Sequence, residues 1–315
     1  MIIQPFTSAD PTSSSPFPRS GPSTAGGADL SKGFLLPWIQ RHELLVYTVL
    51  AYSISWALLI GGYYSTRVGL LDEDGLPVAV MIQVAAAGPL IAALGLTTLT
   101  RGRAGLAFFG RSLIRWRVAP WWYALIFLGI PSIMILAMGW LHPGPIGDAL
   151  HQNWPRLLVQ FPVTVLAVAA FTGLAEEPGW RGYAQPAANR RYQPLVAALV
   201  VSVIWALWHL PNVLFGQGLT ETLLHLLATT VNGFVLAWAY NATGGSVLVV
   251  VLLHGAQNAT AQMVLGLLES AGEAPSASEY YLVSALVFGT LMTVVAVLTR
   301  GRLGTPAVLA RGADR

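Results

Sequence analysis

Long apolar stretches separated by short polar segments dominate the pattern of this chain. Eight of them have about 20 residues, the length that an α-helix needs to cross the hydrocarbon core of a bilayer. They lie near 43–63, 77–99, 121–141, 156–176, 194–212, 222–240, 246–268 and 280–299. The pattern therefore predicts an all-α integral membrane protein with about eight transmembrane helices.

Composition agrees with this prediction. Of the 315 residues, 55% are hydrophobic and only 10% are charged, a balance that excludes an ordinary soluble domain. The chain has no cysteine, which excludes disulfides, thiolate metal sites and cysteine nucleophiles. The net charge of +3 is small, and basic residues in a membrane protein usually belong to cytoplasmic loops, so we expect a lipid bilayer and no nucleic acid as partner.

Basic residues also predict the orientation of the chain. If the N-terminus is cytoplasmic, fifteen of the seventeen Lys and Arg residues lie on the inner side, and only Arg67 and Arg156 lie outside. The acidic loops at 70–75 and 268–279 then lie outside, as the positive-inside rule requires for an even number of spans. We therefore expect both termini to be cytoplasmic and the plasma membrane of a bacterium to be the location.

Ionisable side chains interrupt three of the predicted spans. Glu176 and Glu177 end the fourth span, His209 lies in the fifth, and His254 and Asn258 lie in the seventh. A carboxylate at the bilayer centre costs roughly 2.5–3.5 kcal/mol on insertion scales, so polar groups at such positions are candidates for function.

Helical spacing predicts that two of these groups meet. If the chain turns near 191–194, Glu176 lies about 16 residues before the turn and His209 about 17 residues after it. At 1.5 Å per residue, both side chains are then roughly 24 Å from the turn. We expect them to face each other across spans four and five, in a hairpin that projects into the cytoplasm.

Two pairs at a spacing of four residues complete the cluster. Glu177 and Arg181 are placed for an ion pair within one helix, which leaves Glu176 free for other work. His254 and Asn258 share one helix face and are able to point at the same spot. Plainer alternatives exist for each. The two glutamates are then only structural partners of Arg181, His209 is an interfacial histidine near the outer end of span five, and Asn258 only caps or bridges helices.

The three segments resemble the CAAX-protease and bacteriocin-processing family of intramembrane proteases, CPBP or Abi. The motifs of that family, Glu-Glu-x-x-x-Arg, Phe-x-x-x-His and His-x-x-x-Asn, match EEPGWRG at 176–182, WALWH at 205–209 and HGAQN at 254–258. The chain departs from the pattern at Trp205, where phenylalanine is usual. The resemblance covers residues 156–268 and says nothing by itself about a prenylated substrate.

The resemblance implies a membrane endopeptidase, a hydrolase of protein or peptide substrates that cuts near the cytoplasmic membrane face. In that reading, Glu176 and His209 activate the attacking water, while His254 and Asn258 stabilise the oxyanion or help to hold a metal. Glu176, His209 and His254 also form a plausible set of ligands for zinc or another divalent metal, with one position open to water. Metal-dependent hydrolysis is our expectation, and metal-free hydrolysis stays open.

The hydropathy pattern, the composition and the resemblance together divide the chain. We expect a disordered tail over 1–33, which is rich in Ser, Pro and Gly and lacks the features of a signal peptide. Residues 34–155 form spans one to three, with a basic interfacial segment at 101–120. The catalytic core, spans four to seven, occupies 156–268, and 269–315 holds the last span and a basic tail.

Two other classes of function compete with the protease. Buried Glu and His side chains also form the proton relays of transporters, although no second copy of the EEPGWR or HGAQN segment indicates the internal repeat that transporters often carry. A non-catalytic membrane partner protein is the third class. His225 fits a histidine at the headgroup level better than a ligand.

Overall fold

The computed structural model describes residues 30–274 and 276–305, and within these ranges the chain contains helices and turns but no strand. The predicted all-α membrane architecture is confirmed. Residues 1–29 of the predicted tail and 306–315 lie outside the described residues. Helix α1 (Leu30–Arg41) begins three residues before the expected end of that tail at 33.

The described residues hold seven helices that are long and apolar enough to cross a membrane, or eight if one bent pair counts as a span. In chain order, the seven are α2 (Glu43–Arg67), Trp121–Leu141, Pro143–Asn189, Pro194–Leu214, α11 (Leu219–Ala242), α12 (Val247–Ser270) and α13 (Ala277–Leu298). Together with the bent pair, they match the eight predicted stretches in order.

The bent pair replaces the predicted second span. Helix α3 (Leu76–Ala86) meets α4 (Gly88–Leu113) at 50°. Pro89 lies in the first turn of α4, where its missing N–H costs nothing, so a new helix starts here. The backbone departs from helical geometry once more at Gly102, beyond which α4 carries part of the basic segment predicted at 101–120. Its position at the headgroups stays a prediction.

The fourth span is much longer than the predicted stretch at 156–176. It runs continuously from Pro143 to Asn189, 47 residues, through five successive pieces. These are α7 (Pro143–Val168), the π-helical turn η2 (Ala169–Gly173), α8 (Leu174–Gly179), a second π-helical turn η3 (Trp180–Ala184) and α9 (Gln185–Asn189). Single π-helical turns inside α-helices often mark functional sites.

The turn expected near 191–194 is present. Helix α10 (Pro194–Trp208) starts directly after it, with proline in its first turn, and a short 3₁₀ segment, η4 (Leu210–Phe215), extends α10. Gly244 and Gly245, with φ of 64° and 86°, make the turn that returns the chain into α12. The Ser246 hydroxyl caps α12 by accepting a hydrogen bond from the Val249 N–H at 3.2 Å.

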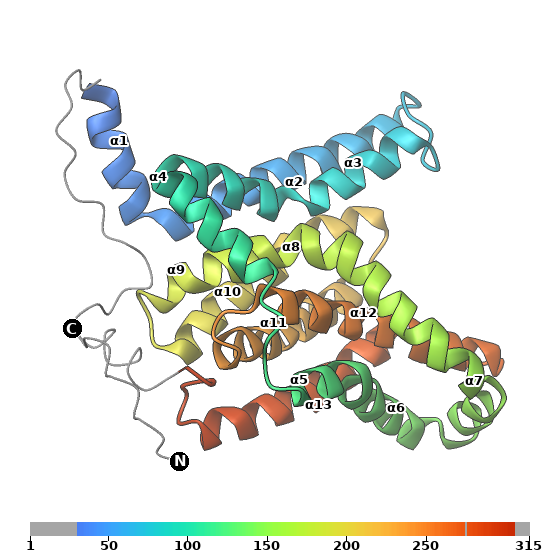
Figure 1. Cartoon of the computed structure of the whole chain (residues 1–315). Coiled ribbons are helices and arrows are strands. Elements are labelled where there is room, and N and C mark those ends of the chain that lie inside the picture. Colours follow the sequence, from blue (N-terminus) through green and yellow to red (C-terminus); the bar gives the residue numbers. More distant parts are fainter. Residues whose placement is uncertain (1–29, 275, 306–315) are drawn as a thin grey trace, which may run out of the picture.

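Helix α12 is the centre of the bundle (Figure 1). In its most apolar window, 67% of the residues are buried, against 22% for α2 and α13. Gly255 explains part of this burial, because a Cβ at this position would lie 2.6 Å from the Val165 carbonyl oxygen of α7. Gly179 has the same role against the Pro89 backbone, at 2.5 Å. Both motif glycines therefore let helices approach each other closely.

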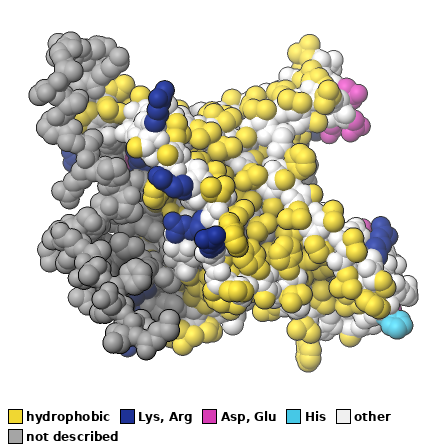
Figure 2. All heavy atoms as spheres, in the orientation of Figure 1, with side chains coloured by type: hydrophobic (Ala, Val, Ile, Leu, Met, Phe, Trp, Pro, Cys, Tyr) yellow, Lys and Arg dark blue, Asp and Glu magenta, His cyan; other side chains and the backbone are white. Residues whose placement is uncertain are grey.

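The surface has the distribution expected of a membrane protein. Figure 2 shows hydrophobic side chains across most of the visible face, with most of the visible basic groups toward one end and acidic groups at the other. Figure 1 places α1 and the turn between α9 and α10 at the first end, and the α2–α3 and α12–α13 connections at the second. The end rich in arginine is the one that we predict to be cytoplasmic.

Because the chain lacks cysteine, single introduced cysteines test this orientation. We expect an impermeant thiol reagent to label Ser276→Cys, in the exposed α12–α13 connection, in intact cells. Tyr192→Cys, in the exposed turn before α10, should be labelled only after the cells are permeabilised. Labelling of Tyr192→Cys in intact cells would reverse the predicted topology.

Candidate active site

Three helices bring the predicted site residues together around the indole ring of Trp205. Glu176 and Glu177 lie on α8, Trp205 and His209 lie at the end of α10, and His254 lies on α12. The centroid of the Trp205 ring is 5.7 Å from that of His209 and 5.5 Å from that of His254, with both imidazoles edge-on to it.

A fully buried ion pair forms the base of the site. The Nη1 group of Arg181 donates to both carboxylate oxygens of Glu177 at 3.0 Å, and neither side chain is exposed (0% for each). This is the pair that the spacing of four residues predicts. The guanidinium also lies 4.6 Å from the centroid of the Trp205 ring, in a cation–π contact. Arg181 thus joins η3 to α10.

Glu177 also holds His254. The Nδ1 atom of His254 lies 2.7 Å from Oε1 of Glu177, and both groups are buried. Since the carboxylate paired with Arg181 accepts, Nδ1 carries the donated proton and Nε2 is left toward the rest of the site. Sequence reasoning assigned Glu177 to Arg181 alone, because the spacing within one helix gives no sign of a partner 77 residues away.

Glu176 has a different partner from the one expected. Its Oε2 accepts a hydrogen bond from Nε1 of Trp205 at 2.8 Å, and among the described residues no hydrogen bond joins it to His209. The indole of Trp205, one turn before His209 on α10, contacts both side chains. A direct approach of Glu176 to His209 stays a prediction. Trp205 is the residue that sequence analysis missed. The signal was its departure from the phenylalanine usual in the motif.

His209 is oriented by its own helix. Its Nδ1 lies 2.9 Å from the Trp205 carbonyl oxygen, which only accepts, so Nδ1 is protonated and Nε2 offers a lone pair when the ring is neutral. On its other side, the His209 ring lies 5.1 Å from that of His225, which stacks on Tyr281 at 4.8 Å. His225 thus belongs to the surroundings of the site, a contact that its place in the sequence did not indicate.

Asn258 follows His254 by one turn of α12 and is partly buried. Its side chain makes no hydrogen bond with the described part of the chain. The neighbouring amide of Gln257 donates to the Asn232 side chain of α11 at 3.1 Å, so a different residue of this segment bridges the helices. Asn258 therefore keeps its amide free beside His254.

The predicted metal ligands do not form a metal site in this arrangement. Between residues 30 and 305, Pro275 aside, no three His, Asp or Glu side chains gather closely enough to hold a metal ion. Two of the three predicted ligands have atoms committed elsewhere, Glu176 to the indole and His254 to Glu177. Zinc or another divalent metal stays a prediction.

Comparison with known proteins identifies the same part of the chain. Residues 158–260 match the family model described as type II CAAX prenyl endopeptidase, Rce1-like. The CAAX prenyl protease 2 of Methanococcus maripaludis is 25% identical over 158 residues, which are 46% of this chain and 56% of that protein. The chain thus spans little more than half of this relative.

The matched segment contains all three motifs, from Glu176 to Asn258, and the helices that bring them together. The motif resemblance, the family model and the relative agree on one assignment. Through this segment, the chain is similar to the CAAX protease (CPBP) family.

Proposed function

We propose that this chain is an intramembrane endopeptidase that hydrolyses a peptide bond near the cytoplasmic membrane face. The observation that carries the proposal is the buried Glu176 carboxylate, which is anchored by one oxygen to Trp205 and flanked across that ring by His209 and His254. A carboxylate held in place with one oxygen left for a water molecule is what a general base requires.

In the proposed reaction, Glu176 removes a proton from a water molecule whose oxygen attacks the carbonyl carbon of the substrate. The lone pair on Nε2 of His209 accepts the other proton of that water in a hydrogen bond and orients it. When the C–N bond breaks, the proton held by Glu176 passes to the leaving nitrogen. One water is consumed, and one carboxyl and one amino terminus are produced.

The developing oxyanion needs donors, and we assign this role to His254 and Asn258. The Nδ1 atom of His254 is bound to the negatively charged Glu177, so the ring is able to carry a second proton on Nε2. The Asn258 amide, on the same helix face, is a second donor. Preorganised donors stabilise charge most strongly where water is scarce, and removal of one oxyanion donor typically slows catalysis by about 10²–10³-fold.

The substrate of this chain is part of the proposal. We propose a protein or peptide, and two probes test the class: a farnesylated peptide ending in a CAAX sequence, and the same peptide without the lipid. Mass spectrometry of the products identifies the cleaved bond. Metal analysis of the same purified protein tests the predicted divalent metal: about one equivalent would support it, and protein that is active without metal would support the metal-free route proposed here.

Glu176→Gln should abolish cleavage without unfolding the protein. The amide keeps the size of the side chain and an oxygen for the Trp205 N–H, but it does not accept a proton. We expect a loss of about 10²–10⁴-fold in turnover and an unchanged unfolding temperature in detergent. If Glu176→Gln cleaved the peptides at the wild-type rate, Glu176 would not be the base. If neither protein cleaved them, the transporter and partner-protein alternatives would be favoured.

Glu177→Gln should lower stability, and it should also slow cleavage, because it removes the carboxylate that supports the second proton on His254. The substitution leaves the Arg181 guanidinium buried without its counter-charge, and breaking a buried pair costs about 3–5 kcal/mol. Glu43→Gln is the matched control, because it breaks pairs with Arg101 and Arg190, which are partly exposed, and should cost less. Thermal unfolding in detergent measures both variants. Equal stability of Glu177→Gln and wild type would contradict the structural role.

Trp205→Phe tests the anchor of the proposed base. It removes the N–H that holds Glu176 but keeps an aromatic ring of the kind usual at this motif position. We expect a folded protein whose turnover is lower by up to about tenfold, the worth of one hydrogen bond. Trp208→Phe is the control, because the buried N–H of Trp208 has no hydrogen-bond partner in the described part of the chain. A rate unchanged in Trp205→Phe would show that the hydrogen bond is dispensable.

A further inference from the structure

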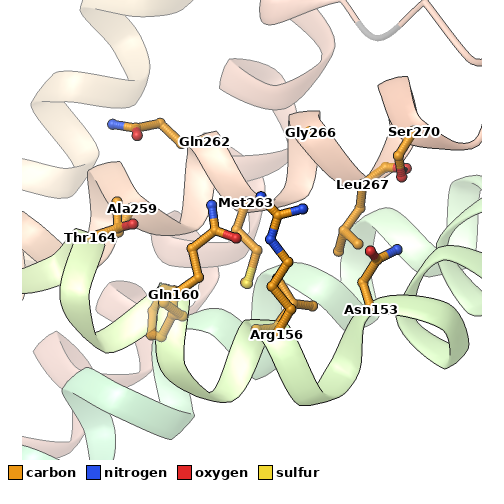
Figure 3. Close-up of a pocket in the computed structure, with 12 residues that line it drawn as sticks. Asn153, Arg156, Gln160, Thr164, Ala259, Gln262, Met263, Gly266, Leu267 and Ser270 are labelled. Carbon is orange, nitrogen blue, oxygen red and sulfur yellow. Dashed lines mark hydrogen bonds between the residues drawn. The ribbon is translucent and has the colours of Figure 1, made fainter.

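A polar cavity opens at the surface of the bundle, and none of the candidate active-site residues lines it. It lies between α7 and α12 and has a volume of about 260 Å³ (Figure 3). Six polar side chains from the two helices line it: Asn153, Arg156, Gln160, Thr164, Gln262 and Ser270. Apolar side chains of Leu157, Phe161 and Met263 complete its wall.

These polar groups are unusual for their position. Arg156, Gln160 and Gln262 are exposed, although α7 and α12 both belong to predicted membrane spans. A charge or an amide that faces hydrocarbon is expensive unless it is paired or reaches the interface. None of the ion pairs among the described residues involves Arg156. The cavity thus presents an unneutralised guanidinium surrounded by amide and hydroxyl donors.

The depth of the cavity fits the headgroup region. Helix α12 runs from Val247, at the end rich in arginine, to Ser270, a rise of about 36 Å for its 24 residues. This exceeds the hydrocarbon thickness of about 30 Å, so Ser270 reaches the opposite headgroup layer. Asn153 and Ser270 lie at the outer end of the cavity (Figure 3), and Arg156 follows Asn153 by only three residues.

We propose that this cavity binds the phosphate headgroup of an anionic phospholipid from the leaflet opposite the end rich in arginine. The planar guanidinium of Arg156 binds two phosphate oxygens at once, and the amides of Asn153, Gln160 and Gln262 add donors. The glycerol and the upper acyl chain lie along Leu157, Phe161 and Met263. A molecule with an anionic head and apolar chains matches both walls of the cavity.

The proposal is independent of proteolysis, because none of the residues that line the cavity belongs to the proposed catalytic set. Charge favours an anionic lipid over a zwitterionic one, since a choline group would bring a second positive charge beside Arg156. A peptide ending in a carboxylate offers similar anion chemistry, and it enters the experiment as a competitor.

The experiment titrates the full chain, purified in a neutral detergent, with dioleoylphosphatidylglycerol and separately with dioleoylphosphatidylcholine. Native mass spectrometry counts the bound lipid, and the unfolding temperature follows saturation, since a ligand that binds only the folded state raises it. We expect saturable binding of the anionic lipid. Arg156→Gln should weaken it roughly 10- to 100-fold, as for the loss of charge-assisted hydrogen bonds.

Two variants make the result specific. Arg67→Gln removes the other basic residue predicted on this side, an exposed one in contact with Tyr63, and should leave the affinity unchanged. Arg156→Lys keeps the charge without the bidentate geometry, so its affinity for the lipid should lie between those of wild type and Arg156→Gln. If Arg156→Gln fails to fold, Arg156→Lys still tests the role of the guanidinium.

Three results would overturn the proposal. Wild-type affinity in a folded Arg156→Gln or an unchanged Arg156→Lys would remove the role of the guanidinium. Equal binding of the phosphatidylcholine would remove the charge selection. The third result is complete displacement of the lipid by glycerol phosphate, or by a peptide with a free C-terminal carboxylate, at a concentration equal to that of the lipid. That result would show that the acyl chains contribute no affinity and that the ligand is not a lipid.

Discussion

The buried contact between Glu177 and Arg181 is the constraint on which the site depends. Two full charges with no exposed surface are tolerated only when each satisfies the other, so α8 and η3 must hold them in register. The same pair then fixes two further elements, because Glu177 binds His254 of α12 and Arg181 lies on the ring of Trp205 in α10. One ion pair thus orients three helices, and the geometry of Glu176 follows from the place of Trp205.

Close backbone packing makes this arrangement possible. Gly179 and Gly255 occupy positions where any Cβ would collide with the backbone of a neighbouring helix, so the motif segments approach to distances that larger residues forbid. In a membrane, where apolar burial between helices contributes little, such contacts and polar bonds between helices provide much of the association energy. The motif glycines therefore belong to the same structural device as the ion pair.

Much of this architecture was predictable, because the bilayer imposes length and burial on every span. The eight stretches, the turn before α10 and the Glu177–Arg181 pair all follow from local rules of length, turn composition and helical spacing. The hydrogen bond from Trp205 to Glu176 and the contact of His225 with His209 were not predictable, since they depend on the rotation of separate helices about their axes. Likewise, local apolarity ended the fourth span near 176, whereas packing continues the helix through the π-helical turn η3 to Asn189.

His209 and His254 have the same side chain but different hydrogen-bond partners, and these partners give them different roles. Both use Nδ1 for orientation and leave Nε2 toward the site, but His209 is bound to a neutral carbonyl and His254 to a carboxylate that already neutralises an arginine. A neutral partner leaves His209 as an acceptor suited to hold water, whereas an anionic partner supports a second proton on His254 and so a donor. The two histidines therefore take different roles, one holding the water and the other stabilising the oxyanion. What decides the role of each is the group bound to its Nδ1 atom, which does not itself contact the substrate.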